Sequence, residues 1–380
     1  MNMANGRVTA TAIGLAAATY VLAAFGQQTS EQAAPPASTS ARQMTAAAAA
    51  FVELLTPAQR ELVTYPVEGE ARTDWSNTPP YVHPRPGLRV GELSEAQRVL
   101  LHDLLRASLS SQGYQKIAGV MRLDDIHRER SVAGLPADAS DYTRAVNGSF
   151  GTMNYSVALF GDPRSDSSWA WLLQGHHLGA SFTVADGRAA IVPLFLGATP
   201  LPVPEDFEIG WSALSHEMTR GQELMRSLTA DQRSAALSAE EVPGDVINGV
   251  GSKLDLTLPA GLKAADMTAP QQRLLRALVE EFVRNADFDA AEEHLAAIEQ
   301  AGWDELSFSW RGTLDDPDEA YYYRVQGPRV VIECRCAPGH IHTMMRDPAN
   351  DYGERWLGLN YLEEMSAADR FAAAQQRAAE

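Results

Sequence analysis

Four of the nine histidines lie in two groups, each beside a predicted turn between strands. His176 and His177 follow an apolar, aromatic strand, and His340 and His342 follow the turn-forming residues 337–339. Alternate residues of a strand point to the same face, so His340 and His342 can offer two imidazoles to one metal ion. His176 and His177 are adjacent and point to opposite faces, so only one of them can readily join that pair.

A third imidazole would complete a mononuclear metal site. Three protein ligands leave an open coordination position for water, as a catalytic site requires. We therefore predict a divalent metal ion on these histidines, with zinc as the first choice. Copper, iron and manganese stay open because imidazole also suits them. The alternative is that His-x-His is an ordinary strand sequence that binds no metal.

Cys334 and Cys336 precede the second histidine pair. If residues 337–339 close a three-residue hairpin, Cys336 lies opposite His340 and Cys334 lies opposite His342, so all four side chains share one face. That register predicts a soft-metal site of two thiolates and two imidazoles. The alternatives are a strained Cys334–Cys336 disulfide and a buried pair of small apolar side chains.

Charged residues near these histidines are candidates for the remaining chemistry. Glu333 or Asp347 would serve as general base, or would orient an imidazole from behind. Arg324 or Arg346 could hold an anionic group of the substrate, since the guanidinium fork matches carboxylate geometry. For Arg346 and Asp347 the simpler interpretation is an ion pair that closes the strand.

Trp171 and Tyr323 each belong to a strand on which aromatic residues alternate. One face of such a strand could bind a sugar or another apolar-faced ligand, but the same alternation is typical of a buried core. Familiar catalytic motifs are missing. His216 and Glu217 have no second histidine at the zincin spacing, and no Gly-x-Ser-x-Gly elbow, P-loop or dinucleotide-binding fingerprint occurs.

The elements that must position these histidines occur twice in the sequence. A Ser or Thr followed three residues later by Gln, ahead of an apolar helical pattern, predicts a capping box at four helix starts. The four caps are Thr56, Ser94, Thr229 and Thr268. Their spacing is 38 residues in the first half and 39 in the second. The strand-like residues 169–175 and 321–327 also correspond, at an offset of 152.

Each half reads as helices followed by an antiparallel meander of short strands, such as the β-branched and aromatic runs 181–184, 191–196 and 321–333. This order predicts an α+β fold of two internally duplicated halves, residues 43–200 and 201–380. We expect the halves to face each other across a pseudo-twofold axis. Such internal pairing would replace a homodimer, so we expect a monomer.

Composition limits the class of protein. The 380 residues are 45% hydrophobic and 21% charged, which is an ordinary globular composition. A net charge of −18 argues against nucleic-acid binding, which needs clustered Lys and Arg. The expected partner is a small molecule or a glycan.

The N-terminal residues read as an export signal and a linker. Arg7 precedes the uncharged residues 8–25, which end beside a small-x-small cleavage site, so residues 1–26 fit a secretory signal peptide. Residues 27–42 are polar and of low complexity, so the fold should begin near Gln43. We expect an extracytoplasmic protein, periplasmic or secreted, with no stable membrane span after cleavage. An uncleaved anchor is the alternative.

Residues 45–365 resemble a family known as domain of unknown function 3500 (DUF3500). The resemblance rests on these segments of the second half: Tyr322-Tyr323-Arg324-Val325-Gln326-Gly327-Pro328, Val331-Ile332-Glu333, His340-Ile341-His342-Thr343, Arg346-Asp347-Pro348 and Asp351-Tyr352-Gly353. The Gly-His-His-Leu sequence in the first half also matches. The resemblance implies frequent secretion signals and no particular reaction. It does not imply cysteine at positions 334 and 336, and this weakens the prediction of a metal site that contains thiolates.

Together these patterns predict an exported metal-dependent enzyme, with hydrolysis as the first choice of reaction and the site between the two halves. One alternative is a copper- or iron-dependent oxidoreductase on the same imidazoles. The other is a non-catalytic binding protein whose halves clamp a small molecule or glycan.

Overall fold

The computed structural model of this chain describes residues 37–201, 212–238, 241–249, 256, 261–314, 316 and 319–359. Its strands are β1 (Thr64–Tyr65), β2 (Leu88–Arg89), β3 (Ser156–Phe160), β4 (Trp169–Gly175), β5 (Leu178–Ala185), β6 (Arg188–Ala198), β7 (Leu262–Lys263), β8 (Ser307–Gly312), β9 (Tyr321–Gly327), β10 (Val330–Ala337) and β11 (His340–Arg346). Its α-helices are α1 (Thr39–Leu54), α2 (Pro57–Val63), α3 (Glu95–Ser108), α4 (Ser111–Ala133), α5 (Asp141–Gly148), α6 (Ser215–Ser227), α7 (Ala230–Ala236), α8 (Ala269–Val283), α9 (Phe288–Ala301) and α10 (Glu354–Leu357). None of these helices is long and apolar enough to cross a membrane. The predicted signal peptide, residues 1–26, lies outside the described residues.

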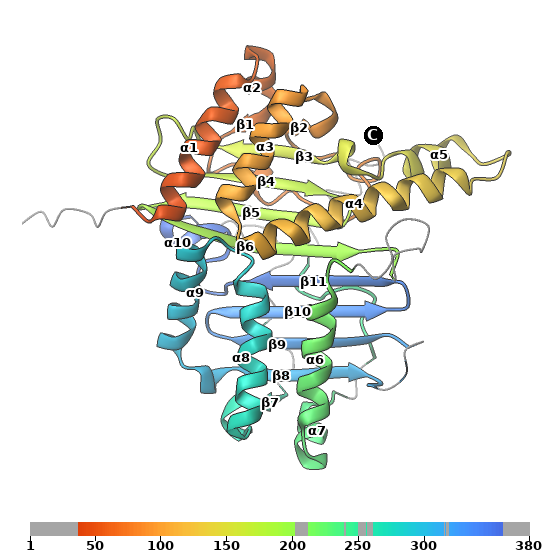
Figure 1. Cartoon of the computed structure of the whole chain (residues 1–380), viewed down its shortest axis with the longest axis vertical. Helices are drawn as coiled ribbons and strands as arrows, with labels where there is room; N and C mark the ends of the chain where they lie inside the picture. The colour runs from red at the N-terminus through yellow and green to blue at the C-terminus, as the bar shows by residue number, and fades with distance from the viewer. Residues whose placement is uncertain are drawn as a thin grey trace, which may run out of the picture. The chain divides into compact units, whose positions relative to one another are not determined.

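The strands form one sheet in the order β1-β3-β4-β5-β6-β11-β10-β9-β8-β7, with β2 paired to β3 (Figure 1). Two antiparallel meanders, β3–β6 and β8–β11, make up most of it, and they join where β6 pairs antiparallel with β11. Helices precede each meander along the chain. The predicted α+β class with antiparallel meanders is confirmed.

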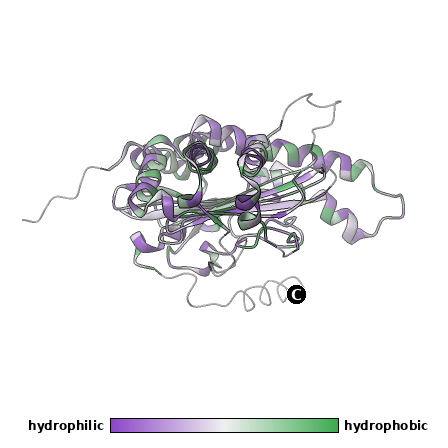
Figure 2. Ribbon diagram, turned by 90° about the horizontal axis from the view of Figure 1, so that it is seen from below, coloured by the Kyte–Doolittle hydropathy of each residue, from purple (hydrophilic) through white to green (hydrophobic). Residues whose placement is uncertain are grey.

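Most of the α-helices cover one face of this sheet, and Figure 2 shows this layer from below. The short α10 follows Tyr352, which packs on the other face. The strand residues on the face under the main helix layer include Trp171, Phe182 and Tyr323, and they pack with helix residues such as Leu104 and Leu278 in the main apolar core. Burying one large apolar side chain stabilises a fold by about 1.5–3 kcal/mol, so this layer carries much of the stability.

The opposite face of the sheet carries a smaller apolar cluster and most of its buried polar groups. Trp75, Val246 and Tyr352 come from segments with little regular structure and pack on Phe160 and Phe195 of the sheet. Because strand side chains alternate between faces, the polar side chains of β11 that lie on this face are separated from the helix layer by the sheet itself. The face opposite the main helix layer therefore carries His340, His342 and Arg346, which alternate with the core residues of β11.

All four predicted capping boxes form, and they interlock in pairs. The side-chain amides of Gln59 and Gln97 bond to each other in both directions, at 3.2 and 2.8 Å, as do those of Gln232 and Gln271, at 3.0 and 2.8 Å. Each pair ties the start of one helix to the start of another. The glutamine that completes each capping box thus also makes a tertiary contact with the glutamine of another box.

Two boundaries differ from the sequence-based expectation. Helix α1 begins at Thr39 with Ser38 as its N-cap, four residues before the predicted start at Gln43. The β10–β11 hairpin pairs Ala337 with His340, so its loop has two residues rather than the predicted three. The shorter loop shifts the pairing of β10 with β11 by one residue. Each β10 side chain therefore lies on the opposite face of the sheet from the β11 side chain that it was predicted to join.

Candidate metal centre

Two turns that are far apart in the sequence meet where β6 ends and β11 begins. His176 and His177 form the turn between β4 and β5, and His177 has a φ of 65°, a left-handed conformation that non-glycine residues rarely adopt. The Gly197 backbone N–H donates a hydrogen bond of 2.8 Å to the His177 carbonyl and so fixes this turn against β6. Turn strain of this kind is common where a side chain must be aimed for function.

Three imidazoles converge at this point. His177, His340 and His342 each offer one ring nitrogen, and the three nitrogens lie within 4.8 Å of one another. The Nε2 atoms of His177 and His340 are 2.8 Å apart. Two nitrogens on one tetrahedral ion are about 3.3–3.4 Å apart, given metal–nitrogen bonds of 2.0–2.1 Å. A separation of about half an ångström more would therefore admit a metal ion.

His342 is oriented by a carboxylate behind it. Its Nδ1 lies 2.6 Å from Asp245 Oδ1, and its buried Nε2 has no hydrogen-bond partner among the described residues. Asp245 accepts further hydrogen bonds from the Asn77 side chain, at 2.9 Å, and from the Val246 backbone, at 2.7 Å. A carboxylate on one imidazole nitrogen, with the other nitrogen left for metal, is the usual arrangement of a metal-ligating histidine.

His176 supports the site from the helix side. Its Nδ1 lies 2.5 Å from Asp124 Oδ1 on α4, and its ring stacks on that of His177 with centroids 3.8 Å apart. Asp124 is itself fixed by the Gly151 backbone N–H at 2.7 Å. The expectation that one member of the adjacent pair joins His340 and His342 is confirmed: His177 converges with them, and His176 packs behind it.

Two of the imidazoles, those of His177 and His340, are favoured in their uncharged form. Burial, followed by the neighbouring histidines, holds the pKa of His177 well below its usual value. Burial and the charges of His342 and His176 lower the pKa of His340 to about 4. Burial works against ionisation of Asp245, but its hydrogen bonds from His342 and Asn77 outweigh that effect and its pKa is lowered. The lone pairs of uncharged His177 and His340 are then available to bind a metal cation.

Gly197 leaves room for the rings. A Cβ atom at this position would lie 2.9 Å from ring carbons of both His177 and His342. Real Cβ atoms essentially never approach other atoms that closely, so any larger residue would displace the two rings. The glycine is required by the close approach of side chains, since its backbone is not in the left-handed region.

The family model described as "Protein of unknown function (DUF3500)" matches residues 37–354. The chain belongs to this family. The match spans both histidine groups and confirms the resemblance seen in the sequence. No curated protein and no solved structure matches the chain.

The two carboxylates predicted as bases in this DUF3500 chain are placed elsewhere. Glu333 is fully buried and accepts hydrogen bonds from the backbone and side chain of Asn248, at 3.0 and 2.5 Å. Asp347 lies at the other end of β11, where Arg329 binds both of its oxygens at 3.1 and 2.7 Å. Five residues of strand, about 16 Å, separate His342 from Asp347, so the role of Asp347 as a base at the histidines is wrong.

The two arginines predicted to bind substrate are buried on the face opposite the main helix layer. Arg346 pairs with Asp351 at 2.5 Å, so the predicted Arg346–Asp347 ion pair is wrong. Arg324 is 2% exposed and donates to the side chain of Gln326. Both guanidiniums are held inside the protein, which gives them a structural role in the described part of the chain.

The predicted aromatic wall is part of the core. The Trp171 ring is fully buried and stacks on Phe182, with centroids 4.0 Å apart. Tyr323 is also fully buried, and its hydroxyl donates to the Glu217 carbonyl at 2.7 Å. Both lie on the helix-covered face, so the prediction that they bind substrate is wrong.

The two cysteines also face the helix layer. In the observed register Cys334 pairs with Thr343 and Cys336 with Ile341, so their side chains point away from His340 and His342. The predicted site of two thiolates and two imidazoles is therefore wrong. Both thiols are free, which leaves the interpretation as small buried side chains; burial raises the pKa of each.

Four supporting residues were missed by the sequence analysis: Asp245, Asn77, Asp124 and Gly197. One signal was available for Asp124, which continues the apolar stripe of Ile117, Val120 and Met121 at helical spacing. A carboxylate in such a stripe needs a buried partner. No comparable local signal marks Asp245 or Asn77, because their partners are far away in the sequence.

Proposed function

We propose that the protein is an exported enzyme that depends on a divalent metal ion, held by His177, His340 and His342, and that its reaction is a hydrolysis. The observation that carries the proposal is the convergence of three imidazole nitrogens within 4.8 Å, one of which is buried without a partner. A buried polar atom with no partner costs free energy, so its retention is accounted for by a ligand that binds there.

Three histidine ligands leave one tetrahedral position for water. A bound divalent ion supplies Lewis-acid chemistry and lowers the pKa of that water, which is what hydrolysis needs at neutral pH. The protein contributes orientation: Asp245 fixes the His342 ring, and the Asp124–His176 pair supports His177 from behind. The substrate class stays a small molecule or a glycan.

Zinc is the first choice for the ion because a set of nitrogen donors with an open position is typical of catalytic zinc. The second candidate function is a copper-dependent oxidoreductase, which the absence of a carboxylate among the three converging ligands favours over an iron enzyme. Metal identity separates the two functions before any substrate is known.

We also infer that the two meanders and their helices are an internal duplication. The support is the repeated element order and the two matching glutamine pairs. The histidines would then lie on the seam of the two halves, and the single chain would act as a monomer. Export rests on the signal-like sequence of residues 1–26.

Metal analysis of the purified protein tests the centre. We expect about one equivalent of zinc or copper in the native protein and none in His342→Ala, because loss of one of three ligands removes the chelate. Asp245→Asn should retain the ligands and weaken metal affinity about 10- to 100-fold. His294→Ala is the matched control, since His294 is similarly buried beside a carboxylate but lies at the other end of β11.

Turnover separates an enzyme from a binding protein. Ester, amide, phosphoester and glycoside substrates should be screened against the metal-loaded protein, with His342→Ala as the blank. Hydrolysis that disappears in the variant and persists in His294→Ala supports the proposal. Native protein without stoichiometric metal, and without thermal stabilisation by zinc or copper, would favour the non-catalytic binding protein.

A further inference from the structure

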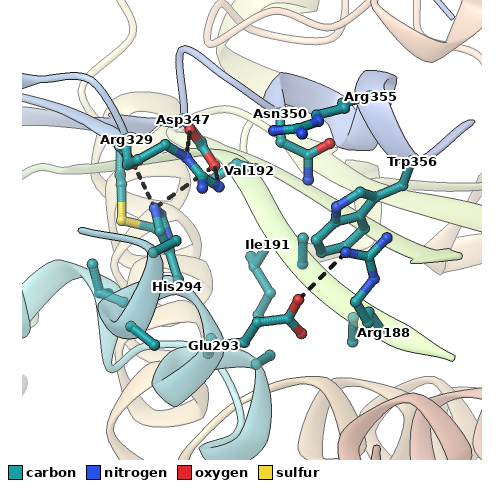
Figure 3. A pocket seen from close by; sticks show the side chains of 18 of the residues that line it. Arg188, Ile191, Val192, Glu293, His294, Arg329, Asp347, Asn350, Arg355 and Trp356 are labelled. Carbon is teal, nitrogen blue, oxygen red and sulfur yellow. Dashed lines mark hydrogen bonds and ion pairs between the residues drawn. The ribbon is translucent and has the colours of Figure 1, made fainter. Parts of the chain in front are cut away.

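A cavity of about 490 Å³ lies at the opposite end of the β6–β11 pair from the histidines. Helix α9, the start of β6, the end of β11 and residues 347–356 enclose it (Figure 3). Its volume falls within the range of small-molecule sites, about 300–1,000 Å³.

Guanidinium groups from three separate segments line this cavity: Arg188, Arg329 and Arg355. Arg329 is committed to Asp347, which it binds at two oxygens. Arg188 stacks on Trp356, with its central carbon 4.4 Å from the ring centroid, and its nearest carboxylate oxygens lie 3.5 and 3.8 Å away. Charge-assisted hydrogen bonds are about 2.7–2.9 Å long, so these pairings leave Arg188 able to bind a closer anion.

Glu293 adds an acceptor beside this guanidinium. Its carboxylate lines the cavity and lies 3.8 Å from Arg188 Nη1 (Figure 3). The side chain of Glu293 is 38% exposed, so a ligand in the cavity can reach it. A ligand with an N–H or O–H group beside its own carboxylate can therefore donate to Glu293 while the carboxylate binds Arg188.

The rest of the lining is apolar. Ile191 and Val192 of β6 and Ala290 and Ala297 of α9 form this surface, which gives a ligand an apolar contact opposite the charged wall. The charges of the lining balance: Arg188, Arg329 and Arg355 face three carboxylates, namely Asp186, Glu293 and Asp347. Because these six charges cancel, the lining does not attract a ligand with several negative charges, such as a polyphosphate. A single carboxylate that pairs locally with Arg188 is compatible with it.

We propose that this cavity binds a small organic carboxylate with an apolar side chain and a neighbouring N–H or O–H donor, which is the chemistry of an amino acid or a 2-hydroxy acid. The carboxylate binds Arg188, the donor bonds to the Glu293 carboxylate, and the apolar side chain packs on Ile191 and Val192. This site is separate from the histidine centre and does not depend on the metal.

Calorimetric titration of the native protein with four probes tests the assignment. The probes are leucine, its 2-hydroxy analogue, 4-methylpentanoate, which lacks the donor, and leucinamide, which lacks the carboxylate. We expect leucine or the hydroxy acid to bind saturably, and the two incomplete probes to bind at least about tenfold more weakly. Which of the two complete probes binds more tightly distinguishes an amino-acid ligand from a hydroxy acid.

Arg188→Gln should weaken binding of the better probe at least about tenfold. Arg276→Gln is the matched control, because Arg276 also stacks on a tryptophan, Trp303, and pairs with a glutamate, but does not line the cavity. Ala297→Phe fills the cavity from a half-buried helix position and should abolish binding while the protein stays folded. Absence of saturable binding by all four probes at millimolar concentration, or binding unchanged in both Arg188→Gln and Ala297→Phe, would overturn the proposal.

Discussion

At one end of the β6–β11 pair three imidazoles converge, and at the other end guanidiniums and carboxylates surround a cavity. The two ends are built from corresponding backbone elements. The β4–β5 turn supplies His177 where β11 begins, and the β9–β10 turn supplies Arg329 where β11 ends. Each end therefore combines a hairpin turn with the start of one central strand and the end of the other.

The two ends differ in burial and in charge. His177 is 3% exposed and its pKa is lowered, whereas the Arg188 side chain is 39% exposed and stacks on Trp356. Burial of neutral nitrogens prepares a site for a desolvated cation, while solvated guanidiniums recruit an anion. The comparison teaches that the strand framework sets the positions and that local burial decides which charge each end accepts.

The strongest way to break the comparison is to disturb one end alone. Gly197→Ala places a methyl group against the rings of His177 and His342, so we expect metal affinity to fall about 10- to 100-fold, as for other changes that misorient a ligand. Metal titration measures this effect, and carboxylate binding at the other end should be unchanged. Gly148→Ala is the matched control, because no atom lies within 4 Å of the added methyl group. Equal metal affinities in the two variants would show that the rings do not need this space.

Acid should act on the histidine end. The folded pKa values of His177 and His340 are lowered, that of His340 to about 4, so in the metal-free protein the unfolded chain binds more protons as pH falls from about 6.5. The free energy of unfolding is therefore expected to be highest above pH 6.5 and to fall towards pH 4. Urea unfolding across this range measures the slope, which should be shallower in His340→Gln and native in Arg276→Gln. If the pH dependence of the unfolding free energy were the same in the native protein and in both variants, the histidine end would not be the source of the acid sensitivity.

The smallest expected effect concerns the framework that the two ends share. Gln97→Ala and Gln271→Ala each remove half of an amide pair and half of a capping box, which should cost about 1–2 kcal/mol in unfolding free energy. If the halves are duplicated, the two costs should agree within about 0.5 kcal/mol, measured by urea unfolding. A clear difference would mean that the two glutamine pairs contribute unequally to the free energy of unfolding.

Local sequence patterns predicted those features that depend on neighbours along the chain. The capping boxes at Ser94 and Thr268 could be read directly, because a cap and its partner are three residues apart. The His340 and His342 pair could be read because alternate strand residues share a face. Trp171 and Tyr323 were ambiguous, since alternation looks the same whether the buried face meets a core or a ligand.

Long-range packing and single-residue register could not be read from the sequence. Asp245 contacts His342 from 97 residues away, and Asn77 contacts Asp245 from 168 residues away, so no spacing rule links them. The cysteine prediction failed because a hairpin loop of two residues instead of three reverses the faces of a whole strand.

By itself, then, the sequence determined the family, the α+β order and the two histidine groups, because each of these rests on residue types and local periodicity. Only the tertiary structure decided that His177 rather than His176 converges with the strand pair, since that choice depends on a left-handed turn held by β6. It also decided that the far end of the same strands forms a pocket. Both outcomes follow from how two distant meanders pair, and the energy of that pairing is spread over contacts that no short stretch of sequence contains.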